Sequence, residues 1–331
     1  MDSYSPKSVL VTGGAGFIAS NLLNTLVLKY PAIQWVCLDR LDYCASLKNI
    51  TVSDQPNYRF VKGDMGAMDF LMHILTSYKI DTIMNLAAQS SVDHSDNNSA
   101  DHVKDNVVAV HNILEATRRY GKIRRLFHIS TDEVYGDQES GEPVHEASLL
   151  VPNNIYSATK AAGEMLVRAY RVSYKLPIVI SRGNNVFGTR QYPEKIWPKF
   201  ATQLLRGEKV TVHGTGETRR NFLHVDDTVS ALETILFKGV IGEIYNIGTS
   251  NELSVLEVAD ALRLRICPQK TLQEVVKYVP DRPFNDTRYI ITSDKLRGLG
   301  WKEEVDFEEG IDELVKWYRE NGEGQWKREE Y

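Results

Sequence analysis

The sequence opens with a strand, a glycine-rich turn and a helix in immediate succession. Ser8–Val11 is a short apolar run, and residues 12–20 (TGGAGFIAS) follow it directly. Residues 17–30 then carry apolar side chains at helical spacing, and residues 35–39 (WVCLD) form a second apolar run that ends in an acid. Strand, glycine turn, helix, strand and terminal acid in this register are the fingerprint of a dinucleotide-binding βαβ unit. The N-terminal part of the chain is therefore predicted to adopt an α/β fold with parallel strands.

The glycine turn and the acid predict how a dinucleotide is held. Gly13 permits the tight turn, and Gly16 lets backbone N–H groups approach a pyrophosphate at the start of the helix. Ala19 occupies the third position of the glycine spacing, which tolerates alanine. Asp39 can accept hydrogen bonds from a ribose 2′-hydroxyl and repels a 2′-phosphate, although Arg40 beside it can soften that repulsion. We therefore expect NAD rather than NADP.

The alternation of strands and helices continues beyond the first unit. Further apolar runs predict strands at residues 58–61, 82–86, 125–129 and 177–181. Helical patterns separate them, over residues 68–77, 102–120 and 156–174. The six strands predict a Rossmann-type doubly wound parallel sheet. Its strand ends, the glycine turn and a Tyr-Lys pair discussed below supply the expected cofactor-binding residues: Gly13, Gly16, Phe17, Ile18, Asp39, Asp64, Met65, Ala87, Ala88, Tyr156 and Lys160.

The second half of the chain has a different character and predicts a smaller lobe. A length of 331 residues suits two lobes, and from about Gly183 the sequence turns to Asn-, Pro- and Gly-rich loops between shorter elements. We expect a cofactor-binding domain over residues 1–182, to which part of residues 222–248 returns. Residues 183–331 should form a smaller, mostly helical substrate-binding lobe, with short strands at residues 208–213 and 243–248. The cleft between the two lobes is then the expected substrate site.

Charge and cysteine content narrow the partners and the compartment. The net charge of −5 argues against nucleic acid or an anionic membrane as the main partner, while single arginines and glycine loops can still bind a phosphate. The three scattered cysteines form no CxxC pair and predict neither a disulfide framework nor a metal site. No apolar stretch resembles a signal sequence or approaches the length of a membrane span. These features predict a cytoplasmic protein without a metal.

The residues after the fifth predicted strand carry the chemistry. Asp132 and Glu133 directly follow Thr131 at the expected carboxyl edge of the sheet, where ligands bind. For an isolated Asp-Glu pair, acids that cap the next helix are the commoner explanation. Tyr156 and Lys160 lie one helical turn apart, and the lysine charge should lower the tyrosine pKa so that the phenolate can take a proton from an alcohol. Because they are expected beside a dinucleotide site, these five residues are the predicted catalytic residues: Thr131, Asp132, Glu133, Tyr156 and Lys160.

Taken together, the motifs resemble those of a known family. Residues 12–18 (TGGAGFI), 130–136 (STDEVYG) and 156–160 (YSATK) are similar to those of the extended short-chain dehydrogenase/reductases, and within them to the nucleotide-diphosphate-glucose 4,6-dehydratases. The resemblance runs nearly end to end. It includes both the dTDP-glucose 4,6-dehydratases of animal type and the UDP-glucose 4,6-dehydratase part of plant rhamnose synthases.

The resemblance implies a three-step reaction. Tyr156, helped by Lys160 and Thr131, would deprotonate the sugar 4-hydroxyl while a hydride leaves carbon 4 for NAD. Glu133 would then remove the proton on carbon 5, and protonated Asp132 would donate to the departing 6-hydroxyl. Hydride returned to carbon 6 gives a 4-keto-6-deoxy sugar. Elimination of water needs both an acid and a base, which explains why two carboxyl groups are present.

The resemblance also implies how the nucleotide-diphosphate-hexose is held. Asn185, Arg220 and Asn251 match contacts to the diphosphate, with Arg219 as an alternative to Arg220. The remaining substrate positions are Ser90, Glu194 and Lys195 around the sugar and His213 against the base, where a hydrogen-bonded core histidine is an equal alternative. In the family, helices that correspond to residues 102–120 and 156–174 pair across a two-fold axis, so the resemblance implies a homodimer with a four-helix bundle.

Three other functions share parts of this pattern. A 4-epimerase of the same fold lacks the acid pair, and a UDP-glucuronate decarboxylase keeps the glutamate but has serine in place of Asp132. A non-catalytic NAD-sensing protein typically loses the tyrosine or the lysine, and both are present here. The choice between thymine and uracil stays open, because it depends on room for one methyl group, worth about 1–3 kcal/mol.

Overall fold

A seven-stranded sheet forms the centre of the computed structural model, which describes residues 4–91, 98–138, 141–281, 286–322 and 324–326. Every neighbouring pair of strands is parallel. The strands are, in sheet order, β10 (Ile244–Ile247), β6 (Ile178–Gly183), β5 (Arg125–Thr131), β4 (Thr82–Asn85), β1 (Ser8–Thr12), β2 (Gln34–Asp39) and β3 (Tyr58–Lys62). The predicted Rossmann-type sheet is confirmed, and β10 joins it as a seventh strand.

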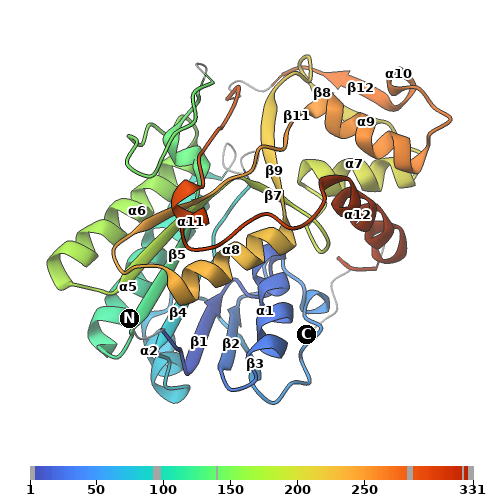
Figure 1. Ribbon diagram of the computed structural model, residues 1–331. Coiled ribbons are helices and arrows are strands. Elements are labelled where there is room, and N and C mark those ends of the chain that lie inside the picture. The colour runs from blue at the N-terminus through green and yellow to red at the C-terminus, as the bar shows by residue number, and fades with distance from the viewer. Residues whose placement is uncertain (1–3, 92–97, 139–140, 282–285, 323, 327–331) are drawn as a thin grey trace.

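Helices cover both faces of this sheet (Figure 1). One face carries α1 (Phe17–Lys29) and α8 (Val225–Lys238), and the other carries α2 (Met68–Ser77), α5 (Ala109–Tyr120) and α6 (Ile155–Tyr174). Strand side chains alternate between the two cores, so that Val9 and Val11 pack toward α1 while Leu10 packs toward α2 and α5. Because both faces of the sheet are buried, each strand is a continuous apolar run in the sequence. This pattern made the strands predictable.

The helix predicted over residues 102–120 has three parts. It begins as α4 (Ser99–Val103), continues as a π-helical turn over Lys104–Val108, and ends as α5 at Tyr120. Gly121 terminates it with a φ of 68°, a left-handed conformation that glycine adopts without strain. The π-helical turn lies against α6, where a Cβ added at Gly163 would come within 2.8 Å of the Asn106 carbonyl oxygen. Such turns recur at functional sites.

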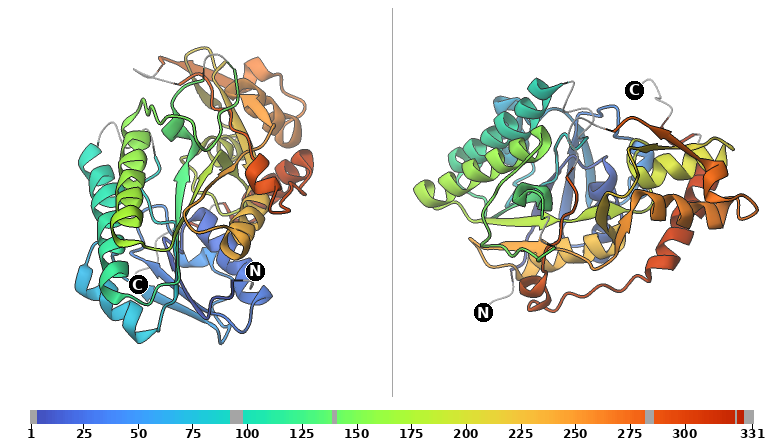
Figure 2. Two further views of the ribbon diagram at one scale, coloured as in Figure 1. Left: turned by 60° about the vertical axis from the view of Figure 1, so that its left-hand side comes forward. Right: turned by 90° about the horizontal axis from the view of Figure 1, so that it is seen from above.

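The C-terminal lobe combines helices with two small sheets and lies beside the upper part of the main sheet (Figures 1 and 2). Its helices are α7 (Ile196–Leu205), α9 (Val255–Ile266), α10 (Leu272–Val275) and α12 (Phe307–Asn321), while α11 (Asp294–Arg297) lies near β10. One sheet contains β11 (Glu252–Ser254), β9 (Arg219–His224) and β7 (Asn185–Phe187), and the other contains β12 (Val276–Val279) and β8 (Val210–His213). Of these strands, only β8 is predicted from the sequence. Within the described ranges, no helix has both the length and the apolar character of a membrane span.

A buried ion pair joins the main sheet to α6. Arg182 and Glu164 approach to 2.6 Å, with side chains 4% and 2% exposed. We expect Glu164→Ala to lower the free energy of unfolding by about 3–5 kcal/mol, because it leaves the Arg182 charge buried without its partner. Glu243→Ala breaks a 2.5 Å pair with Lys295 that is 47% and 33% exposed, and should cost less than about 1 kcal/mol. Urea unfolding measures both; equal losses would contradict this explanation.

Candidate active site

Two adjoining cavities lie where the carboxyl ends of the main strands meet the C-terminal lobe. The first has a volume of about 280 Å³ and is lined by the glycine turn and the loops after β2, β3 and β4. The second has a volume of about 390 Å³ and lies between the end of β5 and the C-terminal lobe. Ser90, Tyr156 and Lys195 line both, so ligands in the two cavities would lie next to each other. All of the residues predicted to bind the cofactor line the first cavity.

The glycine turn of the first cavity has the shape that a pyrophosphate needs. Gly13 has a φ of 67°, and a Cβ there would lie 2.8 Å from the Cα of Ala87. Gly16 precedes α1 and brings no side chain to cap its first N–H groups. Those N–H groups have no carbonyl partner within the helix, and Phe17 and Ile18 lie at the cavity wall. This part of the wall fits a dinucleotide phosphate.

Asp39 lies at the same wall, at the end of β2. Its Oδ2 accepts a hydrogen bond from the backbone N–H of Ala15 (3.0 Å), and its Oδ1 accepts one from that of Leu41 (2.7 Å). The carboxylate is therefore fixed by the glycine turn on one side and by the following loop on the other. Burial raises the pKa of Asp39, while these two hydrogen bonds act in the opposite direction. Its remaining acceptor sites suit a ribose hydroxyl.

Tyr156 and Lys160 lie on α6, as the sequence predicts, but the electrostatic part of the hypothesis is wrong. Burial and the Glu133 charge raise the pKa of Tyr156, whereas the lysine was expected to lower it. Burial lowers the pKa of Lys160 to about 8, and its Nζ donates to the carbonyl oxygen of Ile129 (2.8 Å). Lys160 thus fixes the end of β5 against α6. A phenolate at Tyr156 requires a further positive charge in the site.

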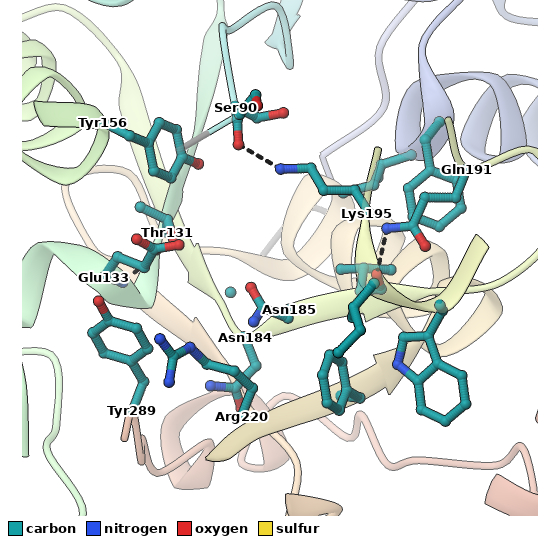
Figure 3. Close-up of a pocket in the computed structure, with 18 of the residues that line it drawn as sticks. Ser90, Thr131, Glu133, Tyr156, Asn184, Asn185, Gln191, Lys195, Arg220 and Tyr289 are labelled. Atoms are coloured by element: carbon teal, nitrogen blue, oxygen red, sulfur yellow. Dashed lines mark hydrogen bonds between the residues drawn. The ribbon is translucent and has the colours of Figure 1, made fainter. Parts of the chain in front are cut away.

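The acid pair lies in a 3-10 turn over Asp132–Tyr135, directly after β5. Burial, together with the Glu133 charge, raises the pKa of Asp132 to about 7. Burial also raises the pKa of Glu133. Thr131 and Glu133 line the second cavity on the same side as Tyr156 (Figure 3), whereas the Asp132 carboxyl is not among its lining groups. Asp132 accepts hydrogen bonds from Thr131 (3.1 Å) and Asn184 (2.6 Å), both of which line the second cavity.

Residues that the sequence analysis did not identify hold the Glu133 carboxylate in place. Asn154 precedes α6, and its side-chain oxygen accepts the backbone N–H of Ser157 (2.8 Å). Its amide nitrogen donates to Glu133 Oε2 (3.0 Å) and lies 3.4 Å from Asp286 Oδ2. Asp286 also accepts from Tyr289, whose ring lines the second cavity. An asparagine before a helix is a recognisable capping signal, but its second role depends on contacts far along the chain.

Most of the predicted substrate residues line the second cavity: Ser90, Asn185, Glu194, Lys195, His213 and Arg220. Asn251 is not among the lining residues of either cavity, and its backbone N–H donates to Thr249 in the turn before β11 (3.2 Å).

Two cations face each other across this second cavity. Arg220 lies over the ring of Tyr289 at 4.8 Å, and Lys195 donates to the carbonyl oxygen of Ser90 (2.5 Å; Figure 3). Arg219 pairs instead with Glu252 (3.1 Å) and Glu257 (2.8 Å), which favours Arg220 as the phosphate contact. Among the described residues, no group of three or more His, Cys, Asp or Glu side chains is arranged to hold a metal ion.

Comparison with known proteins gives consistent matches over nearly the whole chain. A family model described as GDP-mannose 4,6 dehydratase matches residues 10–314. A trifunctional UDP-glucose 4,6-dehydratase/UDP-4-keto-6-deoxy-D-glucose 3,5-epimerase/UDP-4-keto-L-rhamnose-reductase of Arabidopsis thaliana is 47% identical, over 98% of this chain and 49% of its own length. The dTDP-D-glucose 4,6-dehydratase of Bos taurus is 44% identical, over 99% of this chain and 93% of its own length. The chain spans about half the length of the plant relatives that it matches.

A solved structure agrees with these matches. The dTDP-glucose 4,6-dehydratase of Bacillus anthracis, crystallised in complex with NAD, has a TM-score of 0.88 and 36% sequence identity, and the match covers 96% of this chain and 98% of that one. The family model, the curated relatives and the solved structure point to one group. The chain belongs to the nucleotide-sugar 4,6-dehydratases of the extended short-chain dehydrogenase/reductase family.

Proposed function

We propose that the protein is an NAD-dependent 4,6-dehydratase that converts dTDP-glucose or UDP-glucose to the 4-keto-6-deoxy sugar and water. The acid pair after β5 carries the proposal, because Glu133 lines the second cavity together with Thr131 and Tyr156, and Asp132 hydrogen bonds with Thr131 and Asn184 of the same cavity wall. The relatives named as dTDP- and UDP-glucose 4,6-dehydratases support the same chemistry. A 4-epimerase, which only oxidises and reduces carbon 4, has no use for such a pair.

The first cavity suits NAD, with the pyrophosphate at Gly13 and Gly16 and the adenosine ribose at Asp39. When bound, the cofactor would accept a hydride from carbon 4, return one to carbon 6, and supply a positively charged ring in its oxidised form. Tyr156 takes the proton of the sugar 4-hydroxyl, with Thr131 as its hydrogen-bond partner. Lys160 keeps α6 in register with the end of β5.

The two carboxyl groups then carry out the elimination. Glu133, held by the Asn154 amide, removes the proton on carbon 5, which the neighbouring ketone has made acidic. Asp132 gives its proton to the 6-hydroxyl, so that water leaves as the carbon–carbon double bond forms. Because the Asp132 carboxyl hydrogen bonds with Asn184 and does not itself line the second cavity, it must turn toward the cavity to deliver this proton. The raised pKa of Asp132 keeps that proton available near neutral pH.

We propose that residues 1–182, with part of residues 222–248, bind the cofactor, and that residues 183–331 supply the nucleotide-sugar lobe, with Arg220 and Lys195 on the diphosphate and sugar. We also propose a homodimer through α5 and α6. Large apolar side chains on α4 to α6 and the connecting π-helical turn remain exposed on the single chain, namely Val103, Val108, Met165, Val172 and Tyr174. The three cysteines are free thiols, which supports a cytoplasmic location.

Product analysis tests the proposed reaction. The purified protein is incubated separately with dTDP-glucose and UDP-glucose, with and without added NAD. We expect a 4-keto-6-deoxy product from at least one substrate, and the ratio of the two rates identifies the preferred base. Glu133→Gln keeps the size of the side chain but removes the base, and should lower the rate by about 10²–10⁴-fold. Unchanged substrate or a galactose product from the wild-type protein would contradict the proposal.

The pKa of Asp132 predicts how turnover depends on pH. The group must be protonated to donate, and its pKa is raised to about 7. Once Glu133 is ionised, the rate constant should therefore fall as the pH rises through this value. Lys160, with a pKa lowered to about 8, also loses a proton in this range. Lys160→Arg does not titrate there, so it should retain the decline near pH 7. A rate that stays constant to about pH 9 in that variant would show that Asp132 is not the acid.

A further inference from the structure

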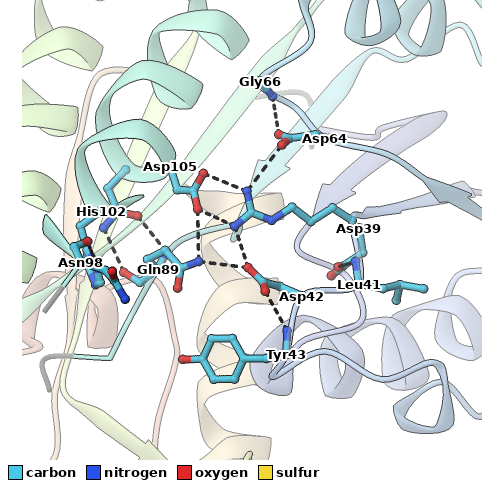
Figure 4. A network of polar contacts seen from close by, with 12 residues as sticks. Asp39, Leu41, Asp42, Tyr43, Asp64, Gly66, Gln89, Asn98, His102 and Asp105 are labelled. Atoms are coloured by element: carbon cyan, nitrogen blue, oxygen red, sulfur yellow. Dashed lines mark hydrogen bonds and ion pairs between the residues drawn. The ribbon is translucent and has the colours of Figure 1, made fainter. Parts of the chain in front are cut away.

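Arg40 contacts acids that come from separate parts of the chain, and Figure 4 labels these acids around the guanidinium. Asp42 follows in the loop after β2, Asp64 comes from the loop after β3, and Asp105 lies on the π-helical turn. All four of these residues line the first cavity, beside Asp39. We call Arg40, Asp42, Asp64 and Asp105 the arginine cage.

The contacts within the cage occupy both terminal nitrogens of the guanidinium. Nη1 and Nη2 of Arg40 donate to the two carboxylate oxygens of Asp105, at 2.9 and 2.5 Å. Nη2 also donates to Asp42 (2.7 Å), and Nη1 lies 3.5 Å from Asp64. Gln89 donates to both Asp42 (3.1 Å) and Asp105 (3.2 Å), which holds these two carboxylates together. The arginine fork is therefore committed to protein groups.

This arrangement changes the expected effect of Arg40 on the preference between NAD and NADP. An arginine directly after the acid at the end of the second strand is the type of residue that accommodates the 2′-phosphate of NADP. A guanidinium that already forms a two-point contact with Asp105 cannot offer the same fork to a phosphate. With Asp39 included, four carboxylates lie around this one cation, so this part of the cavity wall repels a further dianion.

We propose that the arginine cage excludes NADP, with Asp42 and Asp105 as specificity-determining residues that keep Arg40 unavailable. The inference rests on the proposed binding of NAD in the first cavity, but it does not depend on the dehydration reaction. Asp39 repels the 2′-phosphate directly. Asp42 and Asp105 act indirectly, because their ion pairs with Arg40 occupy the cation that would otherwise bind the phosphate.

Measurements of nucleotide binding to variants that have neutral side chains in the arginine cage test the proposed exclusion of NADP. Dissociation constants for NAD and NADP are measured by calorimetry for the wild-type protein after bound nucleotide has been removed. The same measurements are made on the double variant Asp42→Asn/Asp105→Asn and on Asp105→Asn alone. We expect the ratio of the NADP constant to the NAD constant to fall by at least about tenfold in the double variant, through tighter binding of NADP. Asp105→Asn alone should move it in the same direction by less.

Two further variants separate the cage from a general loss of negative charge. Asp294→Asn/Glu308→Gln removes two exposed acids on other elements, 78% and 71% exposed, and should leave the ratio unchanged. Adding Arg40→Leu to the double variant should abolish the gain in NADP binding, because the freed cation is what binds the phosphate. An unchanged ratio in the double variant, or a gain that survives Arg40→Leu, would overturn the proposal. A wild-type protein that binds neither nucleotide would instead refute NAD binding itself.

Discussion

Two adjacent carboxyl groups at the end of a buried strand are the constraint on which the rest of the site depends. Removing Asp132 and Glu133 from water raises the pKa of both, and an ionised group there needs hydrogen-bond donors. The donors are the amides of Asn184 and Asn154. Asn184 also accepts from the backbone of Thr249, and Asn154 begins the helix that carries the tyrosine. The acid pair therefore connects β5, α6 and the C-terminal lobe.

The electrostatics of the two cavities differ in a way that suits their ligands. Where we propose that the adenosine lies, Asp39, Asp42, Asp64 and Asp105 lie around Arg40, an arrangement that favours hydroxyl groups over a second phosphate. In the second cavity, Arg220 lies over Tyr289 near the acid pair and Lys195 lies on the other side, and we propose that the diphosphate and the sugar lie between them. A chain with a net charge of −5 can bind a doubly charged diphosphate because the two cations are local.

The sequence predicted the parts of the structure that depend on neighbouring residues. Strands β1 to β6, the glycine turn and the Gly121 helix end all follow from local patterns, and buried two-sided strands leave a clear apolar signal. The short strands β7, β9, β11 and β12 were not predicted, because their pairing is set by the lobe around them rather than by three to six residues of pattern.

The missed features of the site involve contacts between distant residues. The pairing of Arg40 with Asp105 spans 65 positions, and the contact of Asn154 with Asp286 spans 132. The direction of the Tyr156 pKa shift also depends on burial and on the position of Glu133, which no spacing rule supplies. Sequence motifs predicted which groups react, and the fold shows which distant residues contact them.

The most direct test of the central claim follows one hydrogen atom through the reaction. The substrate is prepared with deuterium on carbon 4 of the glucose, converted in ordinary water, and the product is analysed by mass spectrometry and NMR. Oxidation at carbon 4 followed by elimination and reduction within one site predicts that the product keeps the deuterium, now on carbon 6. Deuterium that is lost to water, or that remains on carbon 4 as in an epimerase, would contradict the assignment of Asp132 and Glu133 as the elimination pair.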